Sequence, residues 1–398
     1  MSEGAILTLN AGSSSLKFAI FAGGGKPRRL WSGAIEEIGL PGAHFRLSDA
    51  RQTVVVDKTG RIDTHEAALD RLFAAIERQS DQLGLAGVGH RVAHGGPECD
   101  CPKPVTPALL AQLHSLVPLA PLHLPANIAG IEAVRAARPE LLQVACFDTS
   151  FHYDMPRLAQ LSGLPRAMQD AGLRRYGYHG LSYEYILGAL RGDGVDVARE
   201  KIIVAHLGNG ASMCAIRGGK SIETTMGFST LAGLPMGTRS GDVDPGLLLH
   251  LLTERRMPVA ELSRLLYAES GLLGLSGLSR DMRDLLARPE AEAAEAVAYF
   301  CYHARRHLAG LTAALGGLDR VVFTGGIGAN APQVRAAICA GLGYLGITLE
   351  RGANAHGAGV ISVPRAPVTV EVRQTDEEAM IAGHVRDQLA THPMAREA

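Results

Sequence analysis

The sequence has almost no excess of charge of either sign and no long apolar run. Thirty-nine Lys and Arg residues are balanced by 40 Asp and Glu residues, so the formal net charge is −1. Proteins that bind nucleic acid or an anionic membrane through their overall field carry a marked positive excess, so we expect neither partner. No run of 18 apolar residues occurs, and Met1–Leu9 has no basic segment followed by a long apolar stretch. We therefore expect no membrane span and no signal peptide.

Cysteine is scarce, and no CxxC pair is present. Of the six cysteines, Cys99 and Cys101 are closest together, but a spacing of one intervening residue does not suit a zinc knuckle. We expect all six to be free thiols in a reducing cytoplasm.

The chain is long and rich in glycine. Its 398 residues suggest two or three domains, and its 47 glycines gather in short runs at predicted strand ends.

Two segments half a chain apart share one pattern of strand, small-residue turn and strand. Residues 5–20 and 201–216 match without a gap at an offset of 196, which pairs Gly12 with Gly208 and Ala19 with Ala215. Chance similarity of two β-hairpins is one explanation. A duplicated domain is the other, because solenoid repeats have periods of only about 20–50 residues.

Strand-like and helical segments alternate around these hairpins. Leu141–Phe147 and Arg320–Thr324 are short and apolar, whereas 292–315 has helical periodicity. The pattern predicts an α/β protein with one mixed sheet in each half and a ligand cleft between the halves. We expect one domain over 1–150, joined by a C-terminal helix at about 376–398, and a nucleotide-binding domain over 151–375.

Three glycine-rich turns follow predicted strands: Asn10–Lys17, His206–Gly210 and Thr324–Asn330. Backbone amides in such turns bind phosphate, although each turn alone could be ordinary hairpin chemistry. Cys214–Ser221 resembles a Walker loop but has cysteine where that motif needs glycine. Gly326–Ala331 fits the GxGxxA of a dinucleotide fold but lacks the accompanying acidic residue, so an NAD-dependent oxidoreductase is a weak alternative.

Two arginines lie where glycine surrounds them. Arg91 is at a predicted strand end, within Gly89–Gly96, and Arg239 is in the turn 236–245. Planar guanidinium donors of this kind can neutralise the oxygens of a transferring phosphoryl group. Structural salt bridges are the alternative for each arginine.

Taken together, these segments resemble those of acetate kinases. Asn10–Lys17 and Met226–Pro245 look like the two signature segments of that family, and further matches follow in the same order along essentially the whole chain. Those matches are Pro118–His123, Phe147–His152, Arg175–Gly180, His206–Gly210, Ser270–Gly274 and Asp281–Arg283.

The resemblance implies a fold, an activity and an assembly. The fold is two duplicated domains of the ribonuclease H-like type shared by acetate and sugar kinases, actin and heat-shock ATPases, with an interdomain cleft. The activity is Mg²⁺-dependent transfer from ATP to acetate, with ADP as the other nucleotide and Mn²⁺ as a possible substitute for Mg²⁺. The assembly is a homodimer. A nucleotide-dependent binding protein of the same fold is a rival, but it would not need Arg91, His179 and Arg239.

The resemblance also assigns roles to residues. Asn10 and Glu377 are expected to hold Mg²⁺. Arg91, Ala93 and His123 are expected to contact the acid, and Asp148, His179 and Arg239 to be catalytic. The expected ATP-binding residues are Lys17, His206, Leu207, Gly208, Asn209, Gly210, Asp281, Met282, Arg283, Gly326, Ile327, Gly328, Ala329 and Asn330.

Chemistry qualifies two of these roles. A carboxylate substrate is already deprotonated at pH 7 and needs no general base. We therefore expect Asp148 to orient an arginine or the waters of the metal rather than to move a proton. Glu377 has a second explanation, because Thr375–Glu378 fits a helix capping box.

The chain departs from the family pattern at several positions. Leu124 replaces a usual asparagine, Ala126 a proline and Ala329 a glutamate, and Tyr183 lies where histidine is common. Ala93 replaces the valine that most acetate kinases have against the substrate methyl group, and propionate kinases share this alanine. One methylene in an apolar pocket changes discrimination by about 10–200-fold, so propionate is the alternative substrate.

Overall fold

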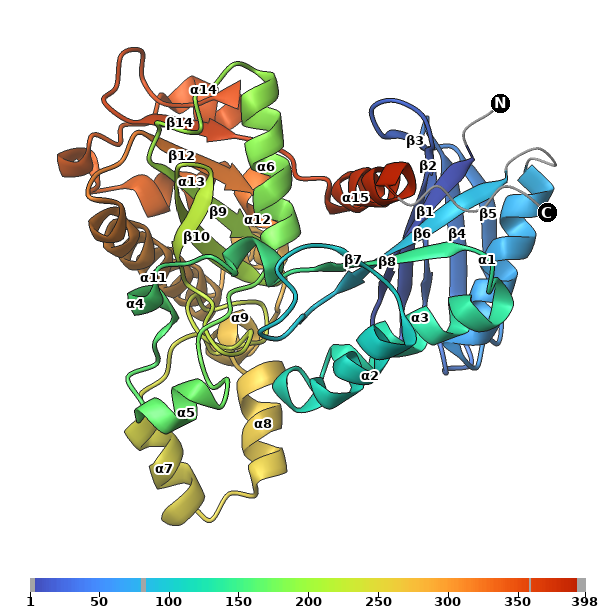
Figure 1. Cartoon of the computed structure of the whole chain (residues 1–398). Coiled ribbons are helices and arrows are strands. Elements are labelled where there is room, and N and C mark those ends of the chain that lie inside the picture. Colours follow the sequence, from blue (N-terminus) through green and yellow to red (C-terminus); the bar gives the residue numbers. More distant parts are fainter. Residues whose placement is uncertain (1–3, 80–83, 358, 392–398) are drawn as a thin grey trace. The chain divides into compact units, whose positions relative to one another are not determined.

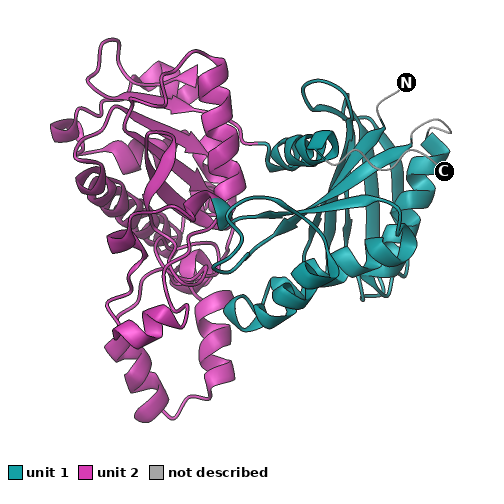
Figure 2. Cartoon of the chain, viewed as in Figure 1, with its two compact units in different colours: residues 1–150, 376–398 teal, residues 151–375 magenta. Residues whose placement is uncertain are grey.

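The computed structural model describes residues 4–79, 84–357 and 359–391. The chain divides into two compact units (Figure 2): unit 1 contains residues 1–150 and 376–398, and unit 2 contains residues 151–375. In the described ranges, no helix combines the length and the apolar character needed to cross a lipid bilayer.

Unit 1 is built on an eight-stranded sheet in the order β5-β4-β3-β2-β1-β6-β8-β7. Its strands are β1 (Ala5–Ala11), β2 (Leu16–Ala22), β3 (Arg28–Glu36), β4 (His44–Asp49), β5 (Val54–Thr59), β6 (Leu85–Val92), β7 (Lys103–Pro104) and β8 (Leu142–Phe147). Its helices are α1 (His65–Gln79), α2 (Pro107–Ser115), α3 (Leu124–Ala137) and α15 (Glu377–Thr391). Alternate residues of β1, Leu7 and Leu9 among them, are buried in one core with α1 and α3.

Helix α15 returns the end of the described chain to the first sheet (Figure 1). It packs on β6 at Gly89, where a Cβ atom would lie 2.3 Å from Ile381 Cγ2. The expected Thr375–Glu378 capping box is wrong, because Asp376 caps the helix by accepting the Ala379 N–H at 2.9 Å. Glu378 instead pairs with Arg29 at 3.4 Å. Glu377 is thereby left without a capping role.

Unit 2 contains a six-stranded sheet in the order β11-β10-β9-β12-β14-β13. Its strands are β9 (Ile202–Leu207), β10 (Ala211–Arg217), β11 (Lys220–Thr224), β12 (Arg320–Thr324), β13 (Gly359–Val360) and β14 (Thr369–Val372). Its helices are α4 (Arg157–Gln160), α5 (Arg166–Asp170), α6 (Gly180–Gly192), α7 (Pro245–Thr253), α8 (Val259–Ala268), α9 (Gly271–Ser276), α10 (Met282–Ala287), α11 (Ala291–Leu315), α12 (Gly325–Asn330), α13 (Pro332–Cys339) and α14 (Arg351–His356).

The central strands of unit 2 bury both faces. Ile202 and Val204 of β9 pack with helix α6, whereas Ile203 and Ala205 belong to the core that contains α11. An uninterrupted apolar strand is the sequence pattern of such a doubly covered strand. Helices therefore cover both faces of the sheet, and the polar loops are found at the ends of its strands.

The two hairpins that look alike in sequence have the same topology. β1 runs antiparallel to β2 and parallel to β6, and β9 runs antiparallel to β10 and parallel to β12. The ungapped sequence match between residues 5–20 and 201–216 does not hold in the second strand of each hairpin, β2 and β10. Thr8 lies opposite Ala19, but its counterpart Val204 lies opposite Cys214 rather than Ala215. The cause is turn length, since residues 12–15 join the first pair and only 208–210 join the second.

Candidate active site

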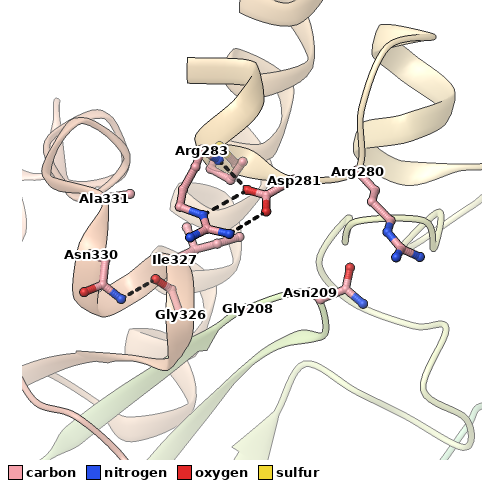
Figure 3. A pocket seen from close by; sticks show the side chains of 10 residues that line it. Gly208, Asn209, Arg280, Asp281, Arg283, Gly326, Ile327, Asn330 and Ala331 are labelled. Atoms are coloured by element: carbon pink, nitrogen blue, oxygen red, sulfur yellow. Dashed lines mark hydrogen bonds and ion pairs between the residues drawn. The ribbon is translucent and has the colours of Figure 1, made fainter. Parts of the chain in front are cut away.

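A cavity of about 750 Å³ in unit 2 brings together three segments expected to bind the nucleotide (Figure 3). They are the turn after β9, the start of α10, and α12 at the end of β12. The cavity is lined by Gly208, Asn209, Arg280, Asp281, Met282, Arg283, Gly326, Ile327, Asn330 and Ala331. Arg280 and Ala331 were missed by the sequence reasoning. Among the expected ATP-binding residues of this unit, His206, Leu207, Gly210, Gly328 and Ala329 lie beside the lining rather than in it.

Backbone geometry shapes the glycine turns of this cavity. Gly325 has φ +78°, and a Cβ atom there would lie 2.6 Å from the Leu207 carbonyl oxygen, so only glycine lets the start of α12 lie this close to the end of β9. Asp281 caps α10 by accepting the Arg283 N–H at 2.8 Å and also pairs with the Arg283 guanidinium at 2.9 Å. These bonds from Arg283 lower the pKa of Asp281, which keeps the carboxylate charged beside the cavity.

Arg335 supports the same cavity from behind. This fully buried arginine donates to the carbonyl oxygens of Gly328 and Ala329 at 2.9 Å each, and to both oxygens of Asn354. The two carbonyls belong to α12, so the guanidinium fixes the segment that lines the cavity. This role could not be predicted from the sequence, because the partners of Arg335 are backbone carbonyls and the amide of Asn354.

A second group of polar residues surrounds the turn at Gly210. His179 Nδ1 lies 2.8 Å from Ser212 Oγ, and the His179 ring stacks on His206 with centroids 4.3 Å apart. A Cβ atom placed on Gly210 would lie 3.3 Å from His179 Nε2 and 3.8 Å from Arg239 Nη1. Two nitrogen groups expected to be catalytic therefore converge on one glycine, whose missing side chain leaves room for a ligand atom.

Unit 1 holds the residues expected to bind the acid. The Arg91 guanidinium makes a two-pronged pair with Asp148, Nε to Oδ1 at 3.0 Å and Nη2 to Oδ2 at 2.7 Å. Arg91 Nη1 lies 3.6 Å from Glu377 Oε2. Burial disfavours the arginine charge, but Asp148 and Glu377 outweigh it and raise the pKa of Arg91 above its ordinary value. Asp148 thus holds the Arg91 guanidinium through both of its carboxylate oxygens.

The residues expected to hold Mg²⁺ have suitable chemistry. Burial raises the pKa of the Glu377 carboxyl, Asp148 and Asp376 add to the rise, and Arg91 and Lys17 oppose it. Asn10 lies opposite Lys17 in the β1–β2 ladder, in the same unit. An amide and a carboxylate are oxygen ligands of the kind Mg²⁺ prefers, and a cation would relieve the crowding of buried acidic groups. In the described ranges, no three His, Cys, Asp or Glu side chains are grouped to hold a metal ion.

Asn127, which the sequence reasoning missed, links two parts of this half-site. Its Oδ1 accepts the Ala93 N–H at 3.0 Å, and its Nδ2 donates to the Ala11 carbonyl at 2.9 Å. The ends of β1 and β6 are thereby tied together beside Ala93. His123 is partly buried at the residue before α3, the helix that carries Asn127.

Comparisons with known proteins agree with this picture. The model of the acetokinase family matches residues 5–383. An acetate kinase of Methylocella silvestris is 47% identical, with 97% of this chain and 98% of the relative covered. The crystal structure of Porphyromonas gingivalis acetate kinase has a TM-score of 0.88 at 36% identity, covering 97% and 100% of the two chains. A propionate kinase structure from Francisella tularensis has a TM-score of 0.90 at 33% identity, covering 96% and 98%. The expected fold is confirmed by these likenesses.

Proposed function

The chain belongs to the acetokinase family, and from this premise we propose that it transfers the γ-phosphoryl group of ATP to acetate. A carboxylate oxygen of the acid bonds to the γ-phosphorus as the bond to the β–γ bridging oxygen breaks. The products are acetyl phosphate and ADP, and the reaction is reversible. The observation that carries this assignment is the convergence of His179 Nε2 and Arg239 Nη1 on Gly210.

In this proposal, unit 2 binds the nucleotide and stabilises the transferring group. Phosphoryl transfer passes through a loose transition state whose charge lies on the equatorial oxygens, so positioned donors supply most of the catalysis. Arg239 carries a permanent positive charge, and His179 offers an N–H from the same side of the turn. The cavity between Asn209, Arg283 and Asn330 is of a size that suits a nucleotide.

Unit 1 binds the acid and contributes the metal site. Asp148 uses the Nε and one Nη2 hydrogen of Arg91, so the substrate carboxylate would be bound through Nη1, which in the structure lies 3.6 Å from Glu377 Oε2. Asn10 and Glu377 would hold Mg²⁺, which neutralises phosphate charge when bound; Mn²⁺ shares its preference for oxygen ligands. Lys17, exposed in β2 opposite Asn10, would contact ATP phosphates.

Propionate is the second candidate substrate, and Ala93 is the observation that favours it. The hydrogen bond to Asn127 fixes the backbone at Ala93. The backbone therefore cannot shift to fill the space that the small alanine side chain leaves. An added substrate methylene is worth about 1–3 kcal/mol in such a pocket.

Trapping of the acyl phosphate tests both substrates together. The protein is incubated with ATP, Mg²⁺ and hydroxylamine, with acetate or propionate in parallel, and the hydroxamate is measured. We expect product with the wild type and its loss in Arg239→Ala. Arg217→Ala, a change at an exposed arginine at the end of β10, is the matched control and should retain activity. Absence of hydroxamate with either acid would overturn the proposed activity.

We also propose that the protein is a homodimer, and helix α7 supports this. Its sequence is PGLLLHLLT, yet it has no buried residue. Leu247 and Leu249 are 50% and 62% exposed. An apolar helix left in water favours association with a second apolar surface, and a second copy of the chain always carries one.

A cytoplasmic location completes the proposal. All six cysteines are free thiols, as expected of a protein kept in a reducing compartment.

A further inference from the structure

Behind His179 lies a chain of two hydroxyl groups. Ser212 Oγ contacts His179 Nδ1 at 2.8 Å, and on its other side it makes a short hydrogen bond with the Tyr183 hydroxyl. Ser212 and Tyr183 are both fully buried. Tyr183 is on α6, one turn after His179, and Ser212 is on β10. The three side chains therefore form a Tyr–Ser–His relay that is buried at Tyr183 and Ser212 and ends at the half-buried His179 imidazole.

The relay holds the imidazole at Nδ1, and Nε2, on the opposite edge of the ring, faces the proposed reaction site. Nδ1 is held by Ser212, whereas Nε2 lies near the position that a Cβ atom on Gly210 would occupy. His179 is itself held by its backbone, which has the left-handed values φ 60° and ψ 25°. The ring orientation is thus fixed by the fold, and the remaining variable is which nitrogen of the neutral ring carries the hydrogen.

The Tyr183 hydroxyl can set the direction of the hydrogen bond between Ser212 and His179. A serine hydroxyl has one hydrogen and can accept further hydrogen bonds, and a tyrosine hydroxyl stays protonated to about pH 10. If Tyr183 donates to Ser212, the single Ser212 hydrogen is directed to His179 Nδ1. The neutral imidazole then carries its own hydrogen on Nε2, facing Gly210. Without the tyrosine hydroxyl, Ser212 can equally accept from Nδ1–H, and a bare Nε2 lone pair faces the same place.

We propose that Tyr183 is a positioning residue that acts through Ser212 to hold neutral His179 with its hydrogen on Nε2; the inference rests on the proposed function. Nε2–H then donates to a phosphoryl oxygen whether the ring is neutral or protonated. In the other tautomer the hydrogen is on Nδ1, and the lone pair on Nε2 would repel that oxygen. The relay thereby keeps an N–H directed at the phosphoryl oxygen even when the imidazole is neutral.

The surroundings fix the tyrosine for this role. The Tyr183 ring packs against Phe151 and, edge to face, against His152, with centroids 6.0 and 5.6 Å apart. Titratable or charged groups face His179 from three sides: His206 stacked on the ring from β9, Arg239 from the turn 236–245, and Tyr183 from α6. His206 has its own hydroxyl partner, Ser182, at 2.8 Å, which Tyr183→Phe leaves in place.

The first test is the pH profile of acyl phosphate formation. In Tyr183→Phe, kcat should fall about tenfold above pH 8, the loss expected from one misdirected hydrogen bond to a charged group, and should recover below pH 6. KM for ATP and for the acid should change less than twofold. Tyr176→Phe is the matched control, since it removes a buried hydroxyl that donates to the Gly172 carbonyl at 2.8 Å. An unchanged profile, or an equal loss in both variants at every pH, would overturn the proposal.

The second test reads the tautomer without using activity. Long-range ¹H–¹⁵N spectra of histidine-labelled protein at pH 8, with His179→Asn to identify the signal, should show Nε2–H in the wild type and a tautomer mixture in Tyr183→Phe. Wild-type His179 with its hydrogen on Nδ1 would refute the relay. If the wild type forms no acyl phosphate, the proposed function fails, whereas the spectra still decide the relay.

Discussion

Arg91 and Asp148 face each other edge to edge, with Nε–Oδ1 and Nη2–Oδ2 distances of 3.0 and 2.7 Å. The two side chains come from neighbouring parallel elements, because Arg91 is in β6 and Asp148 follows the end of β8. The Asp148 side chain is 4% exposed and that of Arg91 is 23% exposed. The carboxylate therefore fixes the position of the guanidinium through Nε and Nη2, while Nη1 lies 3.6 Å from Glu377 Oε2.

Asp148→Asn should leave Arg91 charged but poorly oriented. We expect kcat/KM for the acid to fall by about 100-fold, the usual result of misplacing one charged donor. Breaking a buried pair from one side should also destabilise the fold by about 3 kcal/mol. Hydroxamate kinetics and urea unfolding measure the two effects. Asp154→Asn, which breaks an exposed pair with Lys220, should change neither; full activity of Asp148→Asn would remove this residue from the mechanism.

His90, next to Arg91, should make stability fall in acid. Burial lowers the pKa of His90 to about 4, below its ordinary value of 6.5. The unfolded chain thus takes up the proton first, so the contribution is complete above pH 6.5 and is lost as the pH falls through 4. Its full size is about 3 kcal/mol.

Urea unfolding of wild type and His90→Asn between pH 7 and pH 4.5 tests this expectation. The difference in unfolding free energy between the two proteins should shrink as the pH falls. His114→Gln, at an exposed histidine paired with Glu132, should run parallel to the wild type. A constant difference between wild type and His90→Asn would contradict the lowered pKa.

Arg335→Met should loosen the cavity that we propose binds the nucleotide. The change leaves the Gly328 and Ala329 carbonyls without their buried donor, so we expect a loss of about 2–3 kcal/mol in stability. KM for ATP should rise about tenfold, equivalent to about 1.4 kcal/mol, with KM for the acid unchanged. Arg305→Met is matched, because Arg305 donates to the Ala337 and Ile338 carbonyls at the end of α13. If both variants change KM for ATP equally, Arg335 has no special relation to the cavity.

Ala93→Val should shift the choice of acid. Its two extra methyl groups occupy space next to the Asn127-tethered backbone, so the propionate-to-acetate ratio of kcat/KM should fall at least about tenfold. Ala93→Gly should move the ratio in the opposite direction. The two acids are compared in one assay for each variant, and a ratio that stays constant across the three proteins would show that Ala93 does not line the acyl pocket.

Leu249→Glu should weaken the proposed dimer. A charge on the exposed apolar face of α7 opposes its burial, so sedimentation should show a concentration-dependent shift toward monomer. Leu158→Glu places the same charge on another exposed leucine, 85% accessible, outside α7. A monomeric wild type would overturn the proposal, and equal behaviour of the two variants would remove α7 from the interface.

The fold was predictable because its strands are short and apolar. The predicted strand 141–147 is β8, Leu142–Phe147, and Arg320–Thr324 is β12 without change. The glycine-rich segment that follows it forms the short helix α12, Gly325–Asn330. Turn length was not predictable, because a one-residue difference between turns 12–15 and 208–210 hardly alters an alternating small-residue pattern.

The candidate site was predictable only in its parts. Glycine turns and conspicuous arginines mark Asn209 and Arg239, whose chemistry is visible in their own residue type. Asn127 and Arg335 act through backbone carbonyls that are adjacent only after folding. The capping of α15 has a related explanation, since Thr375 and Asp376 are both N-cap residue types and only the folded backbone places the Asp376 carboxylate at the Ala379 N–H.

The return of α15 to the first sheet has a consequence for biosynthesis. Unit 2 is continuous in sequence, but unit 1 requires residues 377–391, which a ribosome makes after all of unit 2. Until then β6 lacks the cover of Ile381 and Val385 at Gly89, and Arg91 lacks Glu377. The unit proposed to bind the acid is thus the last to be completed, although most of it is translated first.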